Sequence, residues 1–393
     1  MPCGCPYTET ILGFDQMNTT SITERYNDIS INGLLYLVWI ALFLISLTGC
    51  SPAIESEDLL PAVETKLPAT STAEPSVTLL PDTATPDPTN TPYPSSTPQD
   101  PTVTVCRSGC DYQTVQAAID NPGTISGDVI RIMDEVHTEA GILVSKSITI
   151  QGISLERSII QAHEQAAEAT DRVFLIAEGV MVTIRDLVIQ KGYPTQTPYT
   201  GGGILNYGDL TVENCLIRKN RAGDAGGIQN RGNLVVINST ISHNYADGIG
   251  DPGMECGKGG GVVNAFQNTL TVYNSMITSN EAAGKAGGLH VACQGNATLI
   301  NTIISDNRAT RNGGGVFLKG TLTLIDSQIT RNSTQADGGG VIIYGVLNYI
   351  DSAIHNNLAG GNCIIWGDES YRGIGEVGIA ENERIPDNNC HLK

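Results

Sequence analysis

The most regular feature of the chain is a pattern of apolar, polar and small residues that recurs about every 25 positions. Short stretches alternate apolar and polar residues with a period of two, which is typical of half-buried β-strands. A Gly-Gly pair followed by an aliphatic residue occurs six times, with spacings of 24, 34, 27, 27 and 25 residues between the second glycines. The pairs are Gly202-Gly203, Gly226-Gly227, Gly260-Gly261, Gly287-Gly288, Gly314-Gly315 and Gly339-Gly340. This period indicates stacked structural repeats.

Four further positions keep their residue type in every repeat. Asn or Asp is followed by a small residue, two positions later by Ile, and three positions after that by Asn. The isoleucines are Ile217, Ile241, Ile277, Ile304, Ile329 and Ile354, and the last column is Asn220, Asn244, Asn280, Asn307, Asn332 and Asn357. Equivalent residues stacked about 4.8 Å apart would form a continuous core of isoleucine. Asn at the corners can adopt left-handed geometry and bond to the amides above and below it.

These columns predict an all-β fold, a single-stranded right-handed parallel β-helix of roughly nine or ten coils over residues 104–360. A β-propeller blade needs about 40 residues, which is too long for these repeats, and a β-sandwich gives no reason for identical residues to recur in columns. Residues 112–119 place Val115, Ala118 and Ile119 at helical spacing. We expect a short helix there that caps the first coil.

Residues 34–47 form an apolar run of 14 residues, followed by Thr48, Gly49 and Cys50. This length suits the core of a signal peptide and is short of the roughly 18–20 residues that cross a bilayer. The ending from Leu47 to Cys50 resembles the lipobox of bacterial lipoproteins, which implies a lipid on Cys50 and cleavage before it. An uncleaved membrane anchor is the alternative, and either Met1 or Met17 is the true start. In both cases we expect an exported chain held at a cell membrane.

Composition divides the chain into a signal region (1–50), a linker (51–103), the β-helix (104–360) and an irregular tail (361–393). The linker holds 11 of the 18 prolines and is rich in Thr and Ser, so we expect a disordered, extended stalk. The net charge is −19, from 41 acidic and 22 basic residues. Because no segment is basic, a nucleic-acid partner is not expected. The sequence does not indicate an oligomeric state.

The segment from Cys106 to Gly152 resembles the N-terminal part of pectin-lyase-like right-handed β-helix proteins. The coils from Gly201 to Gly361 resemble the repeats of bacterial β-helix surface proteins related to chlamydial polymorphic outer-membrane proteins. The resemblance implies the fold but not the activity, because such folds carry lyases, hydrolases, esterases and adhesins. The motifs of galacturonan hydrolases and pectin methylesterases are absent from this sequence. We expect no cofactor, except that Ca²⁺ could be bound if the chain is a lyase.

The best candidate for a ligand site surrounds the one long repeat, where residues 248–258 are inserted. The candidate residues lie between an Asn corner and the next Gly pair, and they are Arg221, Asp224, Asp247, Asp251, Glu255 and Lys258, with Tyr199 nearby. Equivalent positions stack on one edge, so these side chains could converge. Tyr207, Tyr245 and Phe266 lie in neighbouring coils and offer faces for sugar rings. The same residues also fit an ordinary solvated loop surface.

Ten cysteines in an exported chain favour disulfides. We expect Cys106 to pair with Cys110 and Cys363 with Cys390, and Cys256 could pair with Cys293. Cys215 occupies the small-residue column and is expected to be a buried free thiol.

The histidines give weaker signals. His243, His290 and His355 are candidates for acid–base groups. His243 and His355 each precede an Asn corner, where a polar surface residue is expected, so an ordinary structural role is favoured. No His/Cys cluster has the spacing of metal ligands.

Three functions remain open at this stage. The first is a non-catalytic surface lipoprotein whose β-helix binds glycans or mediates adhesion. The second is a polysaccharide lyase or glycoside hydrolase acting on an acidic polysaccharide, and the third is a structural spacer.

Overall fold

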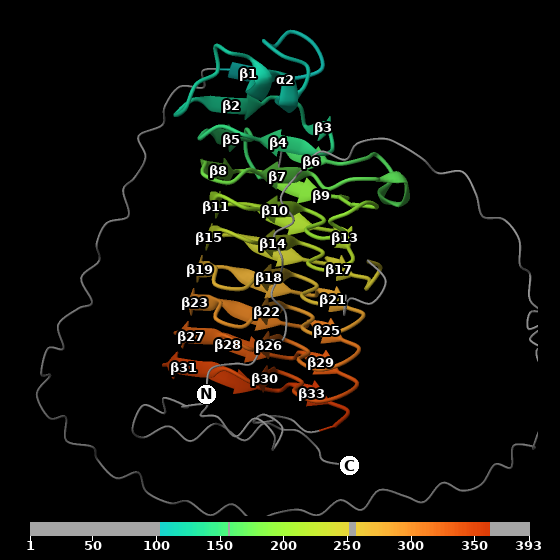
Figure 1. Ribbon diagram of the computed structural model, residues 1–393, viewed down its shortest axis with the longest axis vertical. Coiled ribbons are helices and arrows are strands. Elements are labelled where there is room, and N and C mark those ends of the chain that lie inside the picture. The colour runs from blue at the N-terminus through green and yellow to red at the C-terminus, as the bar shows by residue number, and fades with distance from the viewer. Residues whose placement is uncertain (1–102, 156–157, 251–256, 362–393) are drawn as a thin grey trace, which may run out of the picture. The chain divides into compact units, whose positions relative to one another are not determined.

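In the computed structural model the chain passes repeatedly through the same strand positions, so that equivalent strands stack on one another (Figure 1). The structure describes residues 103–155, 158–250 and 257–361. The apolar run, Cys50, the stalk up to residue 102, and the pair Cys363 and Cys390 therefore lie outside the described residues. Within the described ranges, no helix is both long enough and apolar enough to cross a membrane.

Four parallel sheets are formed by the described residues, and together they account for almost all of the regular structure. The ten-strand sheet contains β1 (Val103–Val105), β2 (Val129–Ile132), β5 (Thr149–Gln151), β8 (Met181–Arg185), β11 (Asp209–Glu213), β15 (Asn233–Ile237), β19 (Thr269–Tyr273), β23 (Asn296–Ile300), β27 (Thr321–Ile325) and β31 (Val346–Ile350). The eight-strand sheet contains β4 (Ile142–Val144), β7 (Phe174–Ile176), β10 (Ile204–Asn206), β14 (Ile228–Asn230), β18 (Val262–Asn264), β22 (Leu289–Val291), β26 (Val316–Leu318) and β30 (Val341–Ile343). Each of the eight coils that begin with β2 to β27 contributes one strand to each of these sheets, whereas the levels of β1 and β31 contribute only to the first.

The other two sheets close the coil on its remaining side. The nine-strand sheet contains β3 (Val136–Thr138), β6 (Ile159–Gln161), β9 (Val188–Gln190), β12 (Leu216–Arg218), β16 (Thr240–Ser242), β20 (Met276–Thr278), β24 (Ile303–Ser305), β28 (Gln328–Thr330) and β32 (Ala353–His355). The six-strand sheet contains β13 (Arg221–Ala222), β17 (Tyr245–Ala246), β21 (Glu281–Ala282), β25 (Arg308–Ala309), β29 (Ser333–Thr334) and β33 (Leu358–Ala359). The ten levels of the longest sheet agree with the nine or ten coils expected, and the β-helix prediction is confirmed.

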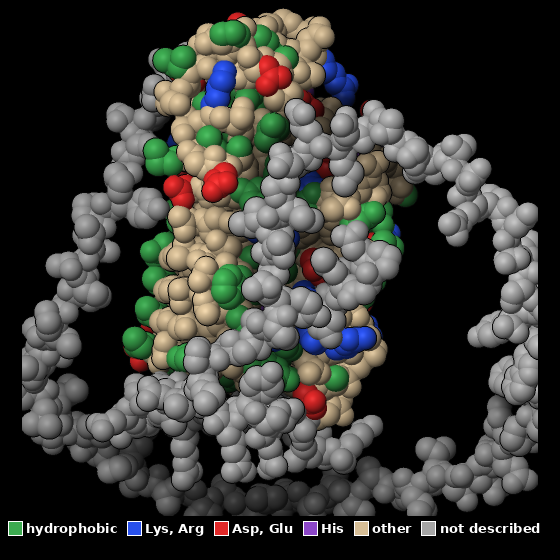
Figure 2. All heavy atoms as spheres, viewed as in Figure 1, with side chains coloured by type: hydrophobic (Ala, Val, Ile, Leu, Met, Phe, Trp, Pro, Cys, Tyr) green, Lys and Arg blue, Asp and Glu red, His purple; other side chains and the backbone are tan. Residues whose placement is uncertain are grey.

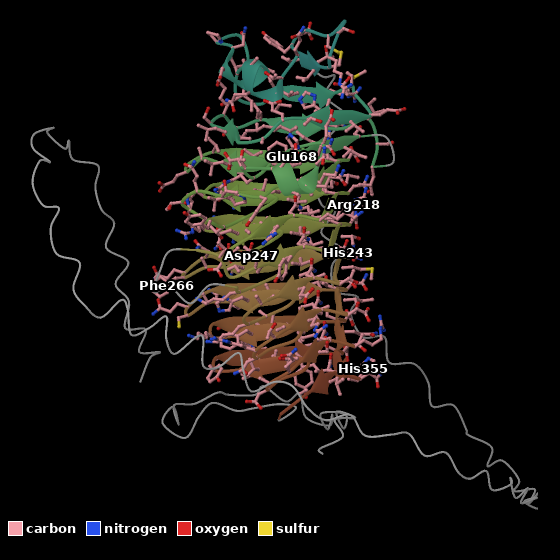
Figure 3. All side chains as sticks on the ribbon, turned by 90° about the vertical axis from the view of Figure 1, so that its right-hand side faces the viewer. Glu168, Arg218, His243, Asp247, Phe266 and His355 are labelled. Carbon is pink, nitrogen blue, oxygen red and sulfur yellow. A yellow bond between two sulfur atoms is a disulfide. The ribbon has the colours of Figure 1, made fainter. Side chains whose placement is uncertain are left out.

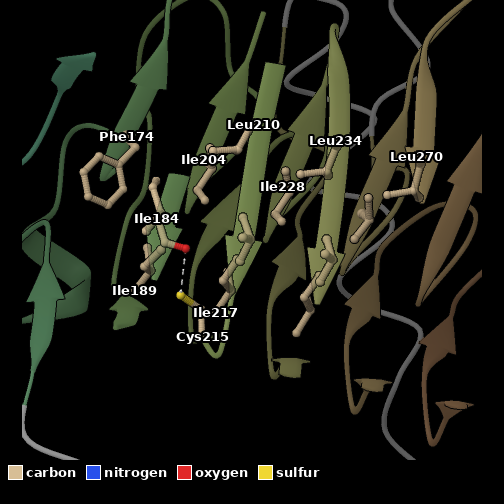
Figure 4. Packing of buried hydrophobic residues seen from close by; sticks show 14 of the residues in the cluster. Phe174, Ile184, Ile189, Ile204, Leu210, Cys215, Ile217, Ile228, Leu234 and Leu270 are labelled. Carbon is tan, nitrogen blue, oxygen red and sulfur yellow. Dashed lines mark hydrogen bonds between the residues drawn. The ribbon is translucent and has the colours of Figure 1, made fainter. Parts of the chain in front are cut away.

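The core is one continuous column of aliphatic side chains along the inside of the stack. Ile217 pairs in register with Ile241, which pairs with Ile277, and the same register continues to Ile354. Leu210, Leu234 and Leu270 form a second such column on the ten-strand sheet (Figure 4). Since each side chain lies on its own equivalent, a slip of one residue would turn the whole apolar set outward.

The two Asn columns differ in burial. Corner residues of the first column are left-handed and bond along the stack, as expected, since Asn301 Nδ2 donates to Asn274 Oδ1 at 2.9 Å. The first column, from Asn214 to Asp351, has positive φ angles of 46–49°. The second column is buried and forms an amide ladder, as where Asn220 Nδ2 donates to Asn244 Oδ1 at 3.0 Å. The ladder continues at 2.9–3.0 Å as far as Asn357. Because every amide is paired, burying this polar column costs little.

A third Asn ladder was not foreseen from the sequence. Asn206, Asn230 and Asn264 end successive strands of the eight-strand sheet and are fully buried. Asn206 Nδ2 donates to Asn230 Oδ1, and Asn230 Nδ2 to Asn264 Oδ1, both at 2.8 Å. The sequence did contain a signal for this ladder. After three of the Gly pairs, the chain reads Gly-Gly, an aliphatic residue, one further residue and then Asn.

The N-terminal end of the stack is covered by α2 (Val115–Asp120), the expected cap helix. Val115, Ala118 and Ile119 are its buried residues, and Thr114 is its N-cap. The Glu139 carboxylate accepts the backbone N–H groups of Val115 at 2.7 Å and of Gln116 at 2.8 Å. These bonds satisfy two of the amides that every helix leaves unpaired at its start.

Cys106 and Cys110, the cysteines expected to pair beside this helix, form a disulfide. They lie between β1 and the start of α2, and Cys106 is buried.

Candidate functional site

Arg221 and Asp247, two of the residues proposed from the sequence, are in direct contact. Arg221 begins β13 and pairs in register with Tyr245 of β17, and Asp247 follows that strand. Arg221 Nε lies 2.6 Å from Asp247 Oδ2, and the guanidinium carbon lies 4.6 Å from the Tyr193 ring centroid and 5.8 Å from that of Tyr245. We call Tyr193, Arg221, Tyr245 and Asp247 the Arg221 cluster.

The two charged groups of the Arg221 cluster differ in exposure. The Arg221 side chain is 46% exposed whereas that of Asp247 is 2% exposed. The carboxylate therefore binds the guanidinium from its buried side, and the rest of Arg221 faces solvent. Burial lowers the pKa of Arg221, but the hydrogen bond and the charge of Asp247 outweigh it and raise that pKa. Burial and the nearby charge of Asp247 raise the pKa of Tyr193. The cluster therefore presents a fixed cation between two tyrosine rings.

Asp224 and Lys258 form a second contact, made through the backbone. Asp224 Oδ1 accepts the backbone N–H of Lys258 at 2.8 Å. The backbone N–H of Asp224 in turn donates to the carbonyl of Tyr199 at 3.2 Å, so Tyr199 contributes a main-chain group. Burial raises the pKa of Asp224, although the hydrogen bond and charge of Lys258 oppose that rise. A carboxyl group with a raised pKa is one that can keep a proton.

The inserted segment begins and ends at one point of the coil. The backbone N–H groups of Gly248 and Gly257 both donate to the carbonyl of Gly223, at 3.1 and 2.8 Å. Asp251 and Glu255 lie outside the described residues, so the proposed gathering of four carboxylates is not tested there. Asp224 and Asp247 have separate partners. In the described ranges, no group of three or more His, Cys, Asp or Glu side chains is arranged to hold a metal ion.

A second set of residues lies on the outer face of the eight-strand sheet and was not singled out as a set from the sequence. His290 in β22 and Phe317 in β26 pair in register, and their ring centroids are 5.4 Å apart. The Tyr344 ring lies 5.4 Å further on. Lys285 Nζ and Lys319 Nζ lie 5.3 and 5.9 Å from the Phe317 centroid. We call this set the His290 strip.

His290 is buried, and neither of its ring nitrogens has a hydrogen-bond partner within the part of the chain that the structure describes. Burial lowers its pKa to about 3, and Lys258, Lys319 and Lys285 add to the effect. The residue is therefore a neutral imidazole in a cationic surrounding.

The other residues considered from the sequence have ordinary surroundings. His243 is exposed and His355 partly buried, and both lie along the same edge as Arg218 (Figure 3). The Phe266 ring is exposed, and Arg231 lies over Tyr207 at 5.9 Å. On the face drawn in Figure 2, acidic and basic side chains are scattered among uncharged surface.

Of the cysteines near these sites, Cys215 is the buried free thiol expected in the small-residue column. Its Sγ donates to the carbonyls of Glu213 and Ile184, at 3.2 and 3.5 Å (Figure 4). Cys293 is also buried, and Cys256, its suggested partner, lies outside the described residues.

Comparison with known families supports the fold. The family described as "Right handed beta helix region" matches residues 173–364. Among solved structures, the pectate lyase Pel9A matches at 16% identity and a TM-score of 0.41, over 65% of each chain, just under two thirds of the lyase's own length. Pectin methylesterase PemA from Erwinia chrysanthemi matches at 11% identity and a TM-score of 0.33, over 67% of this chain and 81% of the esterase.

A third solved structure is the mannuronan C-5 epimerase AlgE4 A-module from Azotobacter vinelandii, at 13% identity and a TM-score of 0.32, over 64% of this chain and 85% of the module. A search of curated protein sequences finds no match. The right-handed parallel β-helix expected from the repeats is confirmed by the matched family.

Proposed function

We propose that this right-handed parallel β-helix belongs to an exported, membrane-anchored surface lipoprotein and binds glycans through the Arg221 cluster. The observation that carries the proposal is the guanidinium of Arg221, which Asp247 holds between the rings of Tyr193 and Tyr245. Guanidinium donors bond to sugar hydroxyl or carboxylate oxygens, and tyrosine rings stack on sugar faces.

The cluster is suited to binding because its geometry is set before a ligand arrives. Asp247 is buried, and its Oδ1 accepts the backbone N–H of Ile249 at 2.7 Å, so the carboxylate cannot rotate freely. Holding Arg221 in place removes much of the side-chain entropy that binding would otherwise cost. The exposed part of Arg221 and the exposed Tyr245 ring remain accessible to a ligand.

Binding is tested with the full chain in mild detergent against a panel of neutral and uronic-acid polysaccharides. Arg221→Ala should weaken binding to any glycan bound by the wild type by about tenfold, equivalent to about 1.4 kcal/mol. Arg308→Ala is the matched control, because the exposed Arg308 starts β25 at the same register position, three coils further along the same sheet. Equal effects of the two variants, or binding to no glycan, would overturn the proposal.

The lipid anchor is tested separately. The apolar run ending in Leu47-Thr48-Gly49-Cys50 supports it. Cells expressing the chain should incorporate radioactive palmitate into it, and Cys50→Ala should abolish the label whereas Cys215→Ser should leave it unchanged. Labelling that survives Cys50→Ala would remove the lipoprotein part of the proposal but not the glycan-binding part.

A second candidate function is cleavage of an acidic polysaccharide, favoured by the raised pKa of Asp224 beside Lys258. A carboxyl group whose pKa is raised by burial is a candidate general acid. The test follows unsaturated products and reducing ends from uronic-acid polysaccharides, with and without Ca²⁺. Release that disappears in Asp224→Asn but persists in Asp209→Asn, a surface control, would support catalysis. No release from any substrate would sink it.

A further inference from the structure

A histidine occupies the first position of the buried isoleucine column, beside the N-terminal cap. His137 of β3 pairs in register with Ile160 of β6, and Ile160 pairs with Ile189 of β9, from which the column continues through the stack (Figure 1). The His137 side chain is 4% exposed, so it is as buried as an isoleucine would be there. A polar ring in a core position needs hydrogen-bond partners for both of its nitrogens.

Two carboxylates provide these partners. His137 Nε2 lies 2.8 Å from Glu139 Oε2, and Nδ1 lies 3.3 Å from Asp134 Oδ2. We call Asp134, His137 and Glu139 the His137 network. Ionised carboxylates only accept hydrogen bonds, so the imidazole can bond to both only when each of its nitrogens carries a proton.

The surroundings of His137 favour this protonated form. Burial lowers the pKa of His137, but the hydrogen bonds and charges of Glu139 and Asp134 outweigh it and raise that pKa. These two carboxylates are the charged groups that act on the ring, and β6 places the apolar Ile160 beside it. The network therefore has one buried cation shared by two anions.

Each carboxylate also binds a separate part of the cap. Glu139 accepts the two backbone N–H groups at the start of α2, at 2.7 and 2.8 Å. Asp134 accepts the backbone N–H of Arg107, at 3.1 Å to Oδ2 and 3.4 Å to Oδ1. Arg107 lies within the loop closed by the disulfide between Cys106 and Cys110, which we call the disulfide loop. The His137 network thus connects both the cap helix and the disulfide loop to the core.

We propose that the His137 network is a pH-sensitive switch, which fixes the disulfide loop to the stack while His137 is protonated and releases it at alkaline pH. A neutral imidazole has a single N–H and can donate to only one of the two carboxylates. The contact with Glu139 is the shorter one, so the proton stays on Nε2 and the bond to Asp134 is lost. Nδ1 then faces a carboxylate oxygen, and two acceptors repel each other. Asp134 loses its position, and the loop bound to it is released, whereas α2 stays bound to Glu139.

The pH range follows from the direction of the shift. Because the pKa of His137 in the folded chain lies above its ordinary value of 6.5, the stabilising contact is fully present below pH 6.5. It is lost as the pH rises through the raised pKa. His290, whose pKa is lowered, is neutral throughout this range, so the two histidines act in separate pH ranges.

The test is hydrogen–deuterium exchange on the full chain in detergent at pH 6.5 and pH 9, with rates corrected for the pH dependence of exchange in unstructured peptides. Protection of the disulfide loop, which includes the Arg107 amide, should fall by about tenfold, the effect of losing one hydrogen bond to a charged group. Protection of α2 should fall less. His137→Ile, which continues the isoleucine column, should give the low protection at both pH values. His163→Gln, at a side chain that is 39% exposed, should behave as the wild type.

Asp134→Asn tests the network while keeping the histidine. The amide retains an oxygen for the Arg107 N–H but lacks the charge that helps to raise the pKa of His137, so the loop should be released at lower pH. Equal protection of the wild-type loop at both pH values would overturn the proposal, as would an equal fall in α2. So would a fall of the same size in His137→Ile, or release of Asp134→Asn at the wild-type pH. The wild-type results decide even if neither variant folds.

Discussion

His290 should make the stability of the β-helix depend on pH between pH 7 and pH 5, above the ordinary pKa values of Asp and Glu. Its ordinary pKa of 6.5 falls to about 3 in the folded chain, first because it is buried and then because of Lys258, Lys319 and Lys285. Below pH 6.5 the unfolded chain binds a proton that the folded chain cannot accept. The folded chain is therefore not destabilised by His290 above pH 6.5, and its free energy of unfolding falls as the pH is lowered from 6.5 toward 3.

The magnitude follows from the two pKa values. A shift from 6.5 to about 3 corresponds to about 5 kcal/mol once both states have titrated, and to about 2 kcal/mol between pH 7 and pH 5. His290→Leu removes this dependence. At pH 7 the variant should be close to the wild type, because losing two unpaired buried nitrogens offsets the loss of the ring contact with Phe317.

The assay is urea denaturation of the full chain in detergent at pH 7 and pH 5. The wild type should lose about 2 kcal/mol more than His290→Leu over this interval. His243→Leu is the matched control, because His243 is exposed and lies in a neighbouring coil. If His290→Leu keeps the wild-type difference between the two pH values, the imidazole is not held neutral and the reasoning fails.

Three further predictions follow from the columns of the stack. Asn280→Ala should cost about 3 kcal/mol in urea denaturation, because the buried Asn244 N–H and Ile241 carbonyl lose the bonds they make to the Asn280 side chain, and Asn244 Nδ2 keeps only its bond to the Ile217 carbonyl. Asn274→Ala at an exposed corner should cost about 1 kcal/mol, and equal losses would contradict the ladder argument. Cys215 should resist iodoacetamide at pH 8 until the chain is unfolded, because burial raises its pKa to about 12, and rapid native labelling would refute this. Gly314→Ala should lower the free energy of unfolding in urea by about 3 kcal/mol, because its Cβ would meet the carbonyls of Gly339 and Ser333. Gly179→Ala, with nothing within 4 Å, should cost only about 1 kcal/mol for its positive φ.

The fold could be predicted because its stabilising contacts are between equivalent residues. Because an isoleucine in one coil packs on the isoleucine of the next, the same residue type recurs at a regular spacing in the sequence, as at Ile217 and Ile241. The cap helix left a comparable local signal at Val115, Ala118 and Ile119. Periodicity in the sequence therefore reports the core directly.

The surroundings of His290 could not be read in the same way. Its place between the inward-facing Leu289 and Val291 predicts an outward and solvated side chain. That face is covered by the turn before each Gly pair, which folds back on the strand, as where a Cβ on Gly338 would meet Ile342. The turns have positive φ at Ala225 and Ala286 as well as at glycines, so the residue types give no constant signature.

The candidate ligand residues show a similar limit. Arg221 and Asp247 are in contact because the register between adjacent coils places Arg221 beside Tyr245, two residues before Asp247. Asp224 instead bonds to the backbone of Lys258, a contact that depends on how the inserted segment rejoins the coil and on no side-chain pattern.

The way that segment joins the coil explains why this place can acquire a function without disturbing the fold. Gly248 and Gly257 both bond to the carbonyl of Gly223, so the insertion leaves and re-enters the coil at one residue. On either side the ladders continue without a shift, with Ala222 paired to Ala246 and Ile228 to Val262. Lengthening a loop whose ends already meet costs little free energy. Changes within the insertion can therefore alter what approaches the Arg221 cluster, while the coils that position Arg221 stay fixed.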